Sequence, residues 1–244
     1  AFDLGATRRA QLLAALTIAA LPATWIDSAV WGQADAVGTS ILLFAASELV
    51  RGNTLRASAL TALAALLKPQ FGIIVPIVAV IARIRAWRAR NPWHAVVAGL
   101  SGAAVVTLVA LPFGATIVDV AYRVLLAGGG YAYLTVGAWN PWALVSVDGV
   151  GLAANNGWAS DTVALPGVGL PGIVLGTVAL LSVILYAAWR ARRDDRTTTI
   201  AAITLIAVAF FVLPTRVHER YLFAAIPLAT ALAASKRNWI LVAV

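Results

Sequence analysis

The sequence predicts an all-α protein built as a polytopic bundle of transmembrane helices, and three observations lead to this prediction. Of the 244 residues, 61% are hydrophobic and only 11% are charged, whereas a typical soluble domain carries about 25% charge. Long uncharged windows recur along the chain, and most of them can cross about 30 Å of hydrocarbon. The basic residues gather in the short breaks between these windows. We therefore expect one transmembrane domain over residues 1–244, with a loop and lip-helix segment at 114–170 outside the membrane.

The distribution of basic residues sets the expected topology. Of the 18 basic residues, 14 lie in five clusters, at 8–9, 51–56, 83–90, 190–196 and 236–237. The positive-inside rule places these clusters in the cytoplasm, where they would face anionic lipid. A basic patch indicates nucleic-acid binding only on a water-facing surface, so nucleic acid is not expected as a partner. The other four basic residues then lie outside the membrane or within its depth: Lys68, Arg123, Arg216 and Arg220.

In the first half of the chain we expect helices at about 10–25 and 37–50, joined by an outer loop at 26–36. Between Arg56 and Arg83 lie only 26 residues, too few for two crossings at about 20 residues each. Lys68-Pro69-Gln70 also interrupts this stretch. Two short helices that meet near Lys68 are therefore predicted, because broken backbone at membrane depth requires protein or a wet cavity around it. Such a break indicates a site.

In the second half, a helix at about 94–113 is expected to return to the outer side. The uncharged stretch at 124–147 is apolar enough for a crossing, but Gly128-Gly129-Gly130 and Asn140-Pro141 interrupt it. These residues favour a loop or a lip helix. Further helices are expected at about 171–189, 198–214 and 221–235, with an outer turn at 215–220.

The residues that could take part in binding or catalysis are expected on the outer side of the membrane. Cations suit phosphate, aromatic rings suit sugar faces, and carboxylates suit hydroxyls or a metal ion. Together they predict a lipid-linked anionic substrate that carries a sugar. The catalytic candidates are Asp35 and His218, and the substrate-binding candidates are Asp27, Gln33, Lys68, Gln70, Trp139, Asn140, Glu219 and Arg220. The chain has no cysteine and only two histidines, which excludes thiolate sites and a three-histidine zinc site.

Several of these residues also have ordinary structural explanations. An ammonium at bilayer depth costs about 2.5–3.5 kcal/mol on insertion scales, which favours a functional Lys68, yet a lysine at a helix end can also snorkel to the interface. Glu219 can form an exposed ion pair that contributes little to stability. Aromatic residues such as Trp139 belong at a membrane interface in any case.

Four short motifs, taken together, resemble a known family. They are Trp31-Gly32-Gln33-Ala34-Asp35 after a helix, Lys68-Pro69-Gln70 before Pro76, Asn140-Pro141-Trp142, and His218-Glu219-Arg220-Tyr221-Leu222. In their order and shared outer face they resemble the bacterial GT-C integral membrane glycosyltransferases, which include mannosyltransferases that use polyprenyl-phosphate sugars. The resemblance covers about residues 20–235.

The resemblance implies that a hexose or pentose such as mannose is transferred, with inversion, from a polyprenyl-phosphate donor to a glycan or lipid acceptor. It places the reaction on the periplasmic face of the bacterial plasma membrane, without a tightly bound cofactor, and leaves open a divalent cation such as Mg²⁺ or Mn²⁺. The family carries its general base in an acidic pair on the first outer loop. The helix at 10–25 is similar to the third helix of the family pattern, so the base is expected upstream of Ala1 in a longer chain.

A second class of function also fits the pattern. A transporter, or a flippase for lipid-linked sugars, places broken helices and intramembrane charge around a polar cavity. Transporters usually consist of two related halves, and this sequence shows no such repeat. Both hypotheses stay open at the level of sequence.

Overall fold

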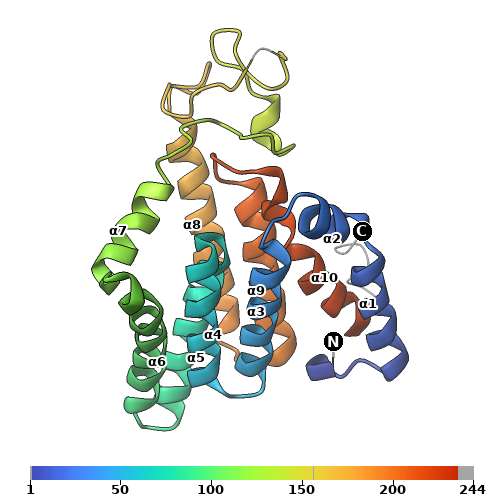
Figure 1. Ribbon diagram of the computed structural model, residues 1–244, viewed down its shortest axis with the longest axis vertical. Coiled ribbons are helices and arrows are strands. Elements are labelled where there is room, and N and C mark those ends of the chain that lie inside the picture. The colour runs from blue at the N-terminus through green and yellow to red at the C-terminus, as the bar shows by residue number, and fades with distance from the viewer. Residues whose placement is uncertain (1, 156, 236–244) are drawn as a thin grey trace.

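The computed structural model describes residues 2–155 and 157–235, and this part of the chain is mostly helical (Figure 1). No β-strand occurs within it, and the only strand-like pairings are isolated bridges. The all-α prediction is confirmed. The basic pair expected at 236–237 lies outside the described residues.

Eight helices form the body of the molecule. They are α1 (Arg8–Ala20), α3 (Asp35–Val50), α4 (Thr54–Leu67), α5 (Val75–Arg88), α6 (Trp93–Ala110), α8 (Gly172–Ala191), α9 (Arg196–Val212) and α10 (Ala225–Ser235). The remaining described elements connect them: η1 (Phe2–Leu4), α2 (Pro22–Trp25), the π-helix η2 (Ile26–Val30), η3 (Pro69–Ile74), η4 (Leu111–Phe113), α7 (Ile117–Ala127), η5 (Pro141–Leu144) and η6 (Glu219–Leu222).

Three helical stretches in the described residues are long and apolar enough to cross a membrane: Pro69–Arg88, Trp93–Phe113 and Gly172–Ala191. A fourth is added if Arg8–Ala20 and Pro22–Val30, which meet at a bend of 54°, are counted as one span. The expected helices at 37–50 and 198–214 are present as α3 and α9, with 16 and 17 residues. Both are shorter than the usual span of about 20 residues.

The predicted break at Lys68 is confirmed. Helix α4 ends at Leu67, Lys68 is extended with φ −150° and ψ 132°, and the 3₁₀ helix η3 begins at Pro69. A residue before proline is driven out of the helical region by the proline ring, so the local sequence explains the break. The chain then continues through η3 into α5. The helical segments before and after the break, α4 and η3–α5, therefore meet at Lys68 as expected.

The main core lies between α3, α4, α5, α9 and α10. Its largest buried side chains include Leu42, Leu49, Phe71, Ile77, Ile203 and Leu228. Gly38 on α3 allows the closest approach, because a Cβ there would overlap the ring of Phe71 from η3. This contact holds the broken segment against the start of α3.

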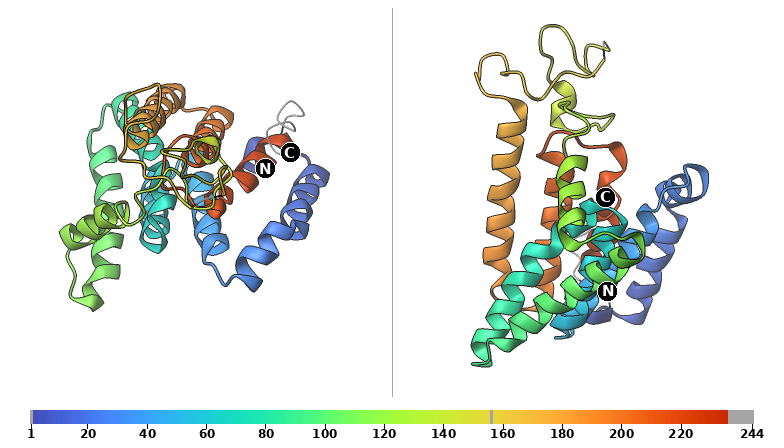
Figure 2. Two further views of the ribbon diagram at one scale, coloured as in Figure 1. Left: turned by 90° about the horizontal axis from the view of Figure 1, so that it is seen from above. Right: turned by 60° about the vertical axis from the view of Figure 1, so that its left-hand side comes forward.

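The segment expected outside the membrane, 114–170, which we call the outer segment, begins with α7 and continues as loops above one end of the bundle (Figure 2). No helix spans 124–147, all of which is described: α7 ends at Ala127 and the next helical element, η5, begins at Pro141. The absence of a crossing in this stretch is therefore confirmed. A small core of Leu134, Val147, Ala159 and Leu165 stabilises the loops.

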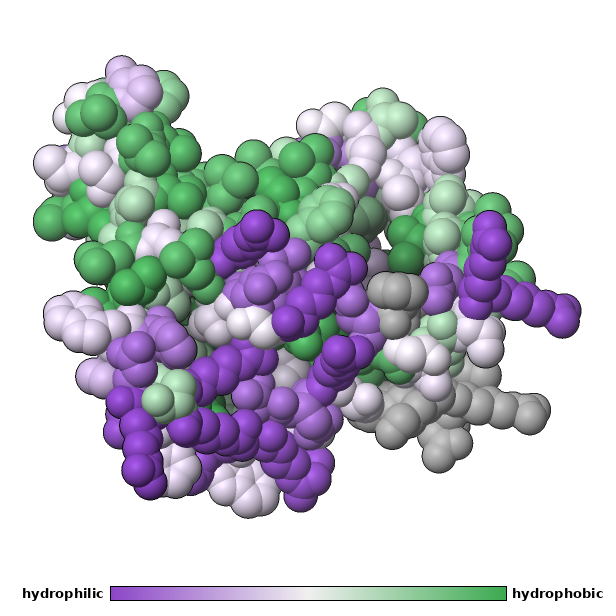
Figure 3. Space-filling model, turned by 90° about the horizontal axis from the view of Figure 1, so that it is seen from below, coloured by the Kyte–Doolittle hydropathy of each residue, from purple (hydrophilic) through white to green (hydrophobic). Residues whose placement is uncertain are grey.

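The opposite end of the molecule carries the arginine clusters, and Figure 3 shows hydrophilic residues gathered on this face. The expectation that residues 83–90 face lipid is wrong for Arg85, whose side chain is only 20% exposed. Arg85 donates to both carboxylate oxygens of Asp194, at 2.7 and 3.1 Å, to Thr54 Oγ1 at 3.0 Å and to the Leu49 carbonyl at 2.8 Å. It therefore ties the turn between α3 and α4 to the turn between α8 and α9.

Candidate functional site

Helix lengths bring Asp35 and Lys68 together, although they are 33 positions apart. Helices α3 and α4 have 16 and 14 residues and pack against each other as a hairpin. At a rise of 1.5 Å per residue each runs about 20 Å. The first residue of α3 and the residue after α4 therefore return to the same end of the bundle.

Asp35 is the centre of the site, and its side chain is fully buried. Lys68 Nζ donates to Asp35 Oδ1 at 2.8 Å and to Gln33 Oε1 at 3.0 Å. Gln70 Nε2 also donates to Asp35 Oδ1, at 3.0 Å. Asp35 is the first residue of α3, where the helix dipole favours a negative charge. The carboxylate is thus held by Lys68 at the break and by Gln70 just after it.

Arg220 reaches the same carboxylate from the other half of the chain. Helix α9 ends at Val212, and the turn after it leads into η6, which contains Glu219 and Arg220. Arg220 Nε lies 3.7 Å from Asp35 Oδ2, and Arg220 Nη1 lies 3.4 Å from Glu219 Oε1. One carboxylate therefore faces two cations, Lys68 on one oxygen and Arg220 on the other.

Asp27 is buried beside this cluster, and no residue that the structure describes forms a hydrogen bond with its carboxylate. It lies on η2, whose wide turn is closed by a bond from Trp31 N to Ile26 O at 2.8 Å. The side chain is 6% exposed, and neither carboxylate oxygen has a hydrogen-bond partner in the described part of the chain. Burying a carboxylate without hydrogen bonds is costly. Such a group is expected where a ligand supplies the missing donors.

A pocket of about 290 Å³ opens next to Asp27, between η2 and the start of α10. Asp27, Glu219 and Arg220 line it, and its remaining walls are Ala23, Ile26, Trp31, Leu222, Phe223 and Ile226. Ile26 and Trp31 are 50% and 54% exposed, so the apolar rim faces outward. The pocket therefore combines one cation and two carboxylates with mainly hydrophobic walls, as ligand sites commonly do.

His218 stands just before η6, and the outer segment holds it in place. Bridges pair it with Val136 and Gly137, and its ring packs edge-on against Tyr131 at 5.1 Å and near Tyr221 at 5.4 Å. Burial, and then the nearby charge of Arg220, lower the pKa of His218 below its ordinary value. The imidazole is therefore neutral at pH 7 and can donate one N–H.

Two residues expected at the site lie elsewhere. Trp139 is 75% exposed and contributes to neither the Asp35 cluster nor the pocket beside Asp27. Asn140 donates to the carbonyl of Phe211 at 3.0 Å, and Trp142 Nε1 donates to the carbonyl of Leu213 at 2.7 Å. The Asn140-Pro141-Trp142 motif therefore satisfies the free carbonyls at the end of α9, and this contact determines the path of the turn that leads to His218.

Sequence reasoning missed a second ion pair that supports the same turn. Asp161 is fully buried, and Arg216 Nε and Nη2 donate to its two oxygens at 2.7 and 3.2 Å. Thr215 Oγ1 donates to Asp161 at 2.7 Å, and Arg216 Nη1 donates to the Gly128 carbonyl at 2.8 Å. Asp161 and Arg216 are far apart in the sequence. The sequence indicated only that an acid and an arginine lie on the same expected face.

A metal site is not evident among the described residues, where no group of three or more histidine, aspartate or glutamate side chains is close enough to hold an ion. The divalent cation stays an expectation from the resemblance. A scan against protein-family models and searches of curated proteins and of solved structures found no match to this chain. What the site can do therefore rests on its own geometry.

Proposed function

We propose that this chain belongs to an integral membrane glycosyltransferase that moves a sugar from a polyprenyl-phosphate donor to an acceptor on the extracytoplasmic side, with inversion. One observation carries the proposal: Arg220 lines the same pocket as the carboxylate of Asp27, which has no hydrogen-bond partner in the described part of the chain, and the other walls are mainly apolar. A phosphate needs a cation, a sugar hydroxyl needs an acceptor, and an isoprenoid chain needs an apolar wall.

In this proposal Arg220 binds the donor phosphate. Its guanidinium is planar and presents several donors, which suits two phosphate oxygens at once. His218, neutral and two residues away, donates its N–H to the phosphate or to the leaving oxygen. As the acceptor hydroxyl attacks the anomeric carbon, the bond from that carbon to the phosphate oxygen breaks and the phosphate leaves with the electron pair. Arg220 and His218 stabilise the charge that develops there.

The two buried aspartates take different roles. Both oxygens of Asp35 face cations. In this proposal Asp35 therefore positions Lys68 and Arg220 and is not a catalytic group. Asp27 has free oxygens and accepts a hydrogen bond from a substrate hydroxyl. By the resemblance, the general base that takes the acceptor proton is a carboxylate of an acidic pair on an outer loop, and neither Asp27 nor Asp35 is assigned that role.

The charge distribution supports the proposed orientation in a bacterial plasma membrane. Arg51, Arg85 and Arg196 meet at the end of the bundle opposite the site, where ion pairs and hydrogen bonds link their turns. The positive-inside rule places such an end in the cytoplasm. The Asp35 cluster and the loops above it would then face the periplasm.

The test is sugar transfer by the full-length protein in membranes, with a radiolabelled polyprenyl-phosphate sugar. Arg220→Ala should lower kcat/KM by about 10²-fold, because a charge-assisted hydrogen bond is worth about 1.5–3 kcal/mol. Asp27→Asn should also lower it, and Arg123→Ala is the matched control, since Arg123 is exposed on α7. Wild-type transfer in both pocket variants would overturn the proposed roles.

The same membranes distinguish the transporter hypothesis. In sealed vesicles, labelled donor that crosses the bilayer without appearing in any acceptor product would identify a flippase. Under the proposed function, label accumulates in product, and free polyprenyl phosphate is released in equal amount. Loss of both processes in Arg220→Ala would not separate the two classes, so the product assay of the wild type decides between them.

A further inference from the structure

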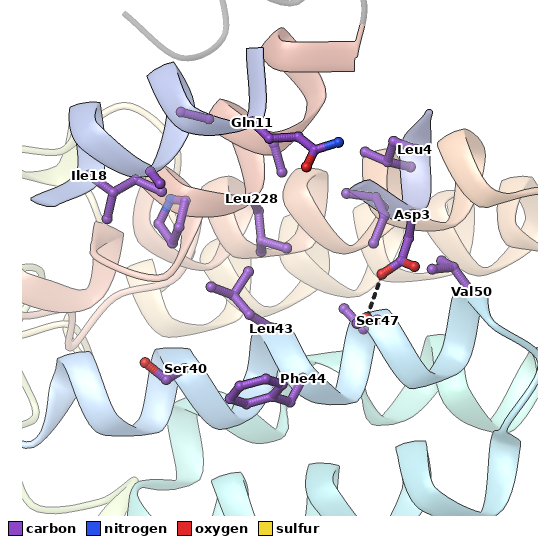
Figure 4. A pocket seen from close by; sticks show the side chains of 16 residues that line it. Asp3, Leu4, Gln11, Ile18, Ser40, Leu43, Phe44, Ser47, Val50 and Leu228 are labelled. Carbon is purple, nitrogen blue, oxygen red and sulfur yellow. Dashed lines mark hydrogen bonds between the residues drawn. The ribbon is translucent and has the colours of Figure 1, made fainter. Parts of the chain in front are cut away.

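A long apolar groove lies on the other side of the molecule from the α6 and α7 helices, between α1 and α3, with α10 as its floor (Figures 1 and 4). Its volume is about 410 Å³, and none of the residues assigned to sugar transfer lines it. Its walls include Ala14 and Ile18 from α1, Leu43 and Phe44 from α3, and Leu228 from α10. From Ser40 to Val50 it follows α3 for about 15 Å at 1.5 Å per residue.

The groove stays open because α1 packs mainly on α10. All 13 residues of α1 keep part of their surface exposed, and Phe44 on the facing side of α3 is 66% exposed. Exposed apolar surface of this extent on a soluble protein would mark an interaction site. In a membrane protein, such a groove between helices requires an apolar occupant.

The few polar side chains in the groove already have partners. Gln11 donates to the Ala6 carbonyl at 2.7 Å, and Ser40 donates to the Ala36 carbonyl at 2.8 Å. Ser47 donates to Asp3, as Figure 4 shows. Because these donors are satisfied within the chain, the walls offer an occupant chiefly apolar contact. The chemistry therefore fits a hydrocarbon chain better than a polar ligand.

One end of the groove is strongly basic. Asp3 closes this end, paired with Arg51 at 2.8 Å, and Arg196 donates to its backbone carbonyl at 3.3 Å. Arg8 lies one helical turn before Gln11 on the same face of α1, and both Arg8 and Arg9 are exposed. The guanidinium groups of Arg8, Arg9, Arg51 and Arg196 outnumber the carboxylates near this end, which are Asp3 and Glu48, the latter 3.8 Å from Arg51. The mouth therefore complements an anionic headgroup.

We propose that this groove binds one anionic phospholipid of the cytoplasmic leaflet. An acyl chain lies between α1 and α3, and the phosphate headgroup meets the arginines at the start of α1 and the end of α3. This inference goes beyond sugar transfer but rests on the proposed orientation, in which the helices lie in a membrane and the arginine end faces the cytoplasm. The bound lipid fills the space that α1 leaves open and thereby holds α1 against the bundle.

The test is native mass spectrometry of the purified full-length protein, titrated with phosphatidylglycerol and, separately, with phosphatidylcholine of the same chains. Phosphatidylglycerol should bind at one site more tightly than phosphatidylcholine. Arg8→Gln with Arg9→Gln should weaken its binding about 10- to 30-fold, as each arginine near a lipid surface contributes about 1 kcal/mol. Ala14→Phe should fill the groove and abolish the site.

Matched controls separate this site from general attraction to a basic surface. Arg192→Gln with Arg193→Gln removes two exposed arginines at the same end, and Leu13→Phe enlarges a side chain on the exposed side of α1. Both should bind phosphatidylglycerol like the wild type. Equal affinity for the two lipids, or equal weakening by both arginine pairs, would overturn the proposal. So would a disulfide between two copies of Ala15→Cys, because a second copy would then occupy the groove.

Discussion

At the scale of single residues, the site depends on how the buried carboxylate of Asp35 is neutralised. Lys68 supplies the shorter of its two ion pairs, at 2.8 Å, and the Lys68 side chain is only 24% exposed. Removing one partner of a buried pair leaves an uncompensated charge and costs about 3–5 kcal/mol. The partial exposure of Lys68 moves the expected effect to the lower end of that range.

Lys68→Met should therefore lower the free energy of unfolding by about 3 kcal/mol, measured by denaturant titration in detergent micelles. Lys68→Met combined with Asp35→Asn should recover part of this loss, because the buried charge is removed as well. Arg123→Met, at an exposed position on α7, should change stability little. A loss below about 0.5 kcal/mol for Lys68→Met would show that Arg220 alone neutralises Asp35.

His218 makes stability depend on pH in a defined direction. Burial, followed by the charge of Arg220, lowers the pKa of His218 below its ordinary value of 6.5 in the folded protein, whereas Glu219 acts in the opposite direction. As the pH falls below 6.5, the unfolded chain binds a proton before the folded protein does. Stability from this group is therefore present above pH 6.5 and is lost as the pH falls toward the lowered pKa.

The melting temperature of the wild type should fall between pH 7 and pH 5, and His218→Gln should flatten this dependence. His94 is the only other histidine and is exposed, so His94→Gln serves as the control and should retain the wild-type slope. If His218→Gln retained it as well, the acid sensitivity would belong to other groups.

At the scale of elements, the contact of α3 with the broken segment determines where Asp35 and Gln70 meet. Gly38 lies one turn after Asp35 on α3, and a Cβ there would overlap the Phe71 ring of η3. Gly38→Ala should therefore destabilise the protein by about 1–3 kcal/mol, as overpacking does. Phe71→Leu in the same chain should relieve part of the strain.

The control for this substitution is Gly99→Ala on α6, where nothing lies within 4 Å of an added Cβ. Alanine favours a helix over glycine by about 0.5–1 kcal/mol, so this variant should be neutral or more stable. Thermal unfolding of both variants provides the comparison. Similar stability in the two would show that α3 and η3 can separate without loss.

At the scale of the whole molecule, charge is divided between two ends. The absence of cysteine from the chain allows single cysteines to report which end faces which side. Ala154→Cys in the outer loops and Arg192→Cys after α8 are both exposed. In intact cells a membrane-impermeant maleimide should label Ala154→Cys and spare Arg192→Cys until the membrane is opened. Labelling of both in intact cells would contradict the proposed orientation.

Much of the fold could be predicted from local rules. Pro69 after Lys68 predicts the break, and the glycines at 128–130 with Pro141 predict loops in place of a crossing. The partners of Arg85 could not be predicted, because a cluster of arginines is equally consistent with lipid contact and with an ion pair. Asp194, its partner, is 109 positions away, and no local pattern indicates such a distance.

The sequence by itself determined the helical class, the order of the helices and the break at Lys68, because composition, proline chemistry and charge clusters act locally. It also identified Asp27, Asp35, Lys68 and Arg220 as candidates. Only the tertiary structure decided that Asp35 is enclosed by two cations and that Asp27, beside a pocket, has no hydrogen-bond partner among the described residues. Helix lengths and the path of each turn set those distances, and both depend on packing between segments far apart in the chain.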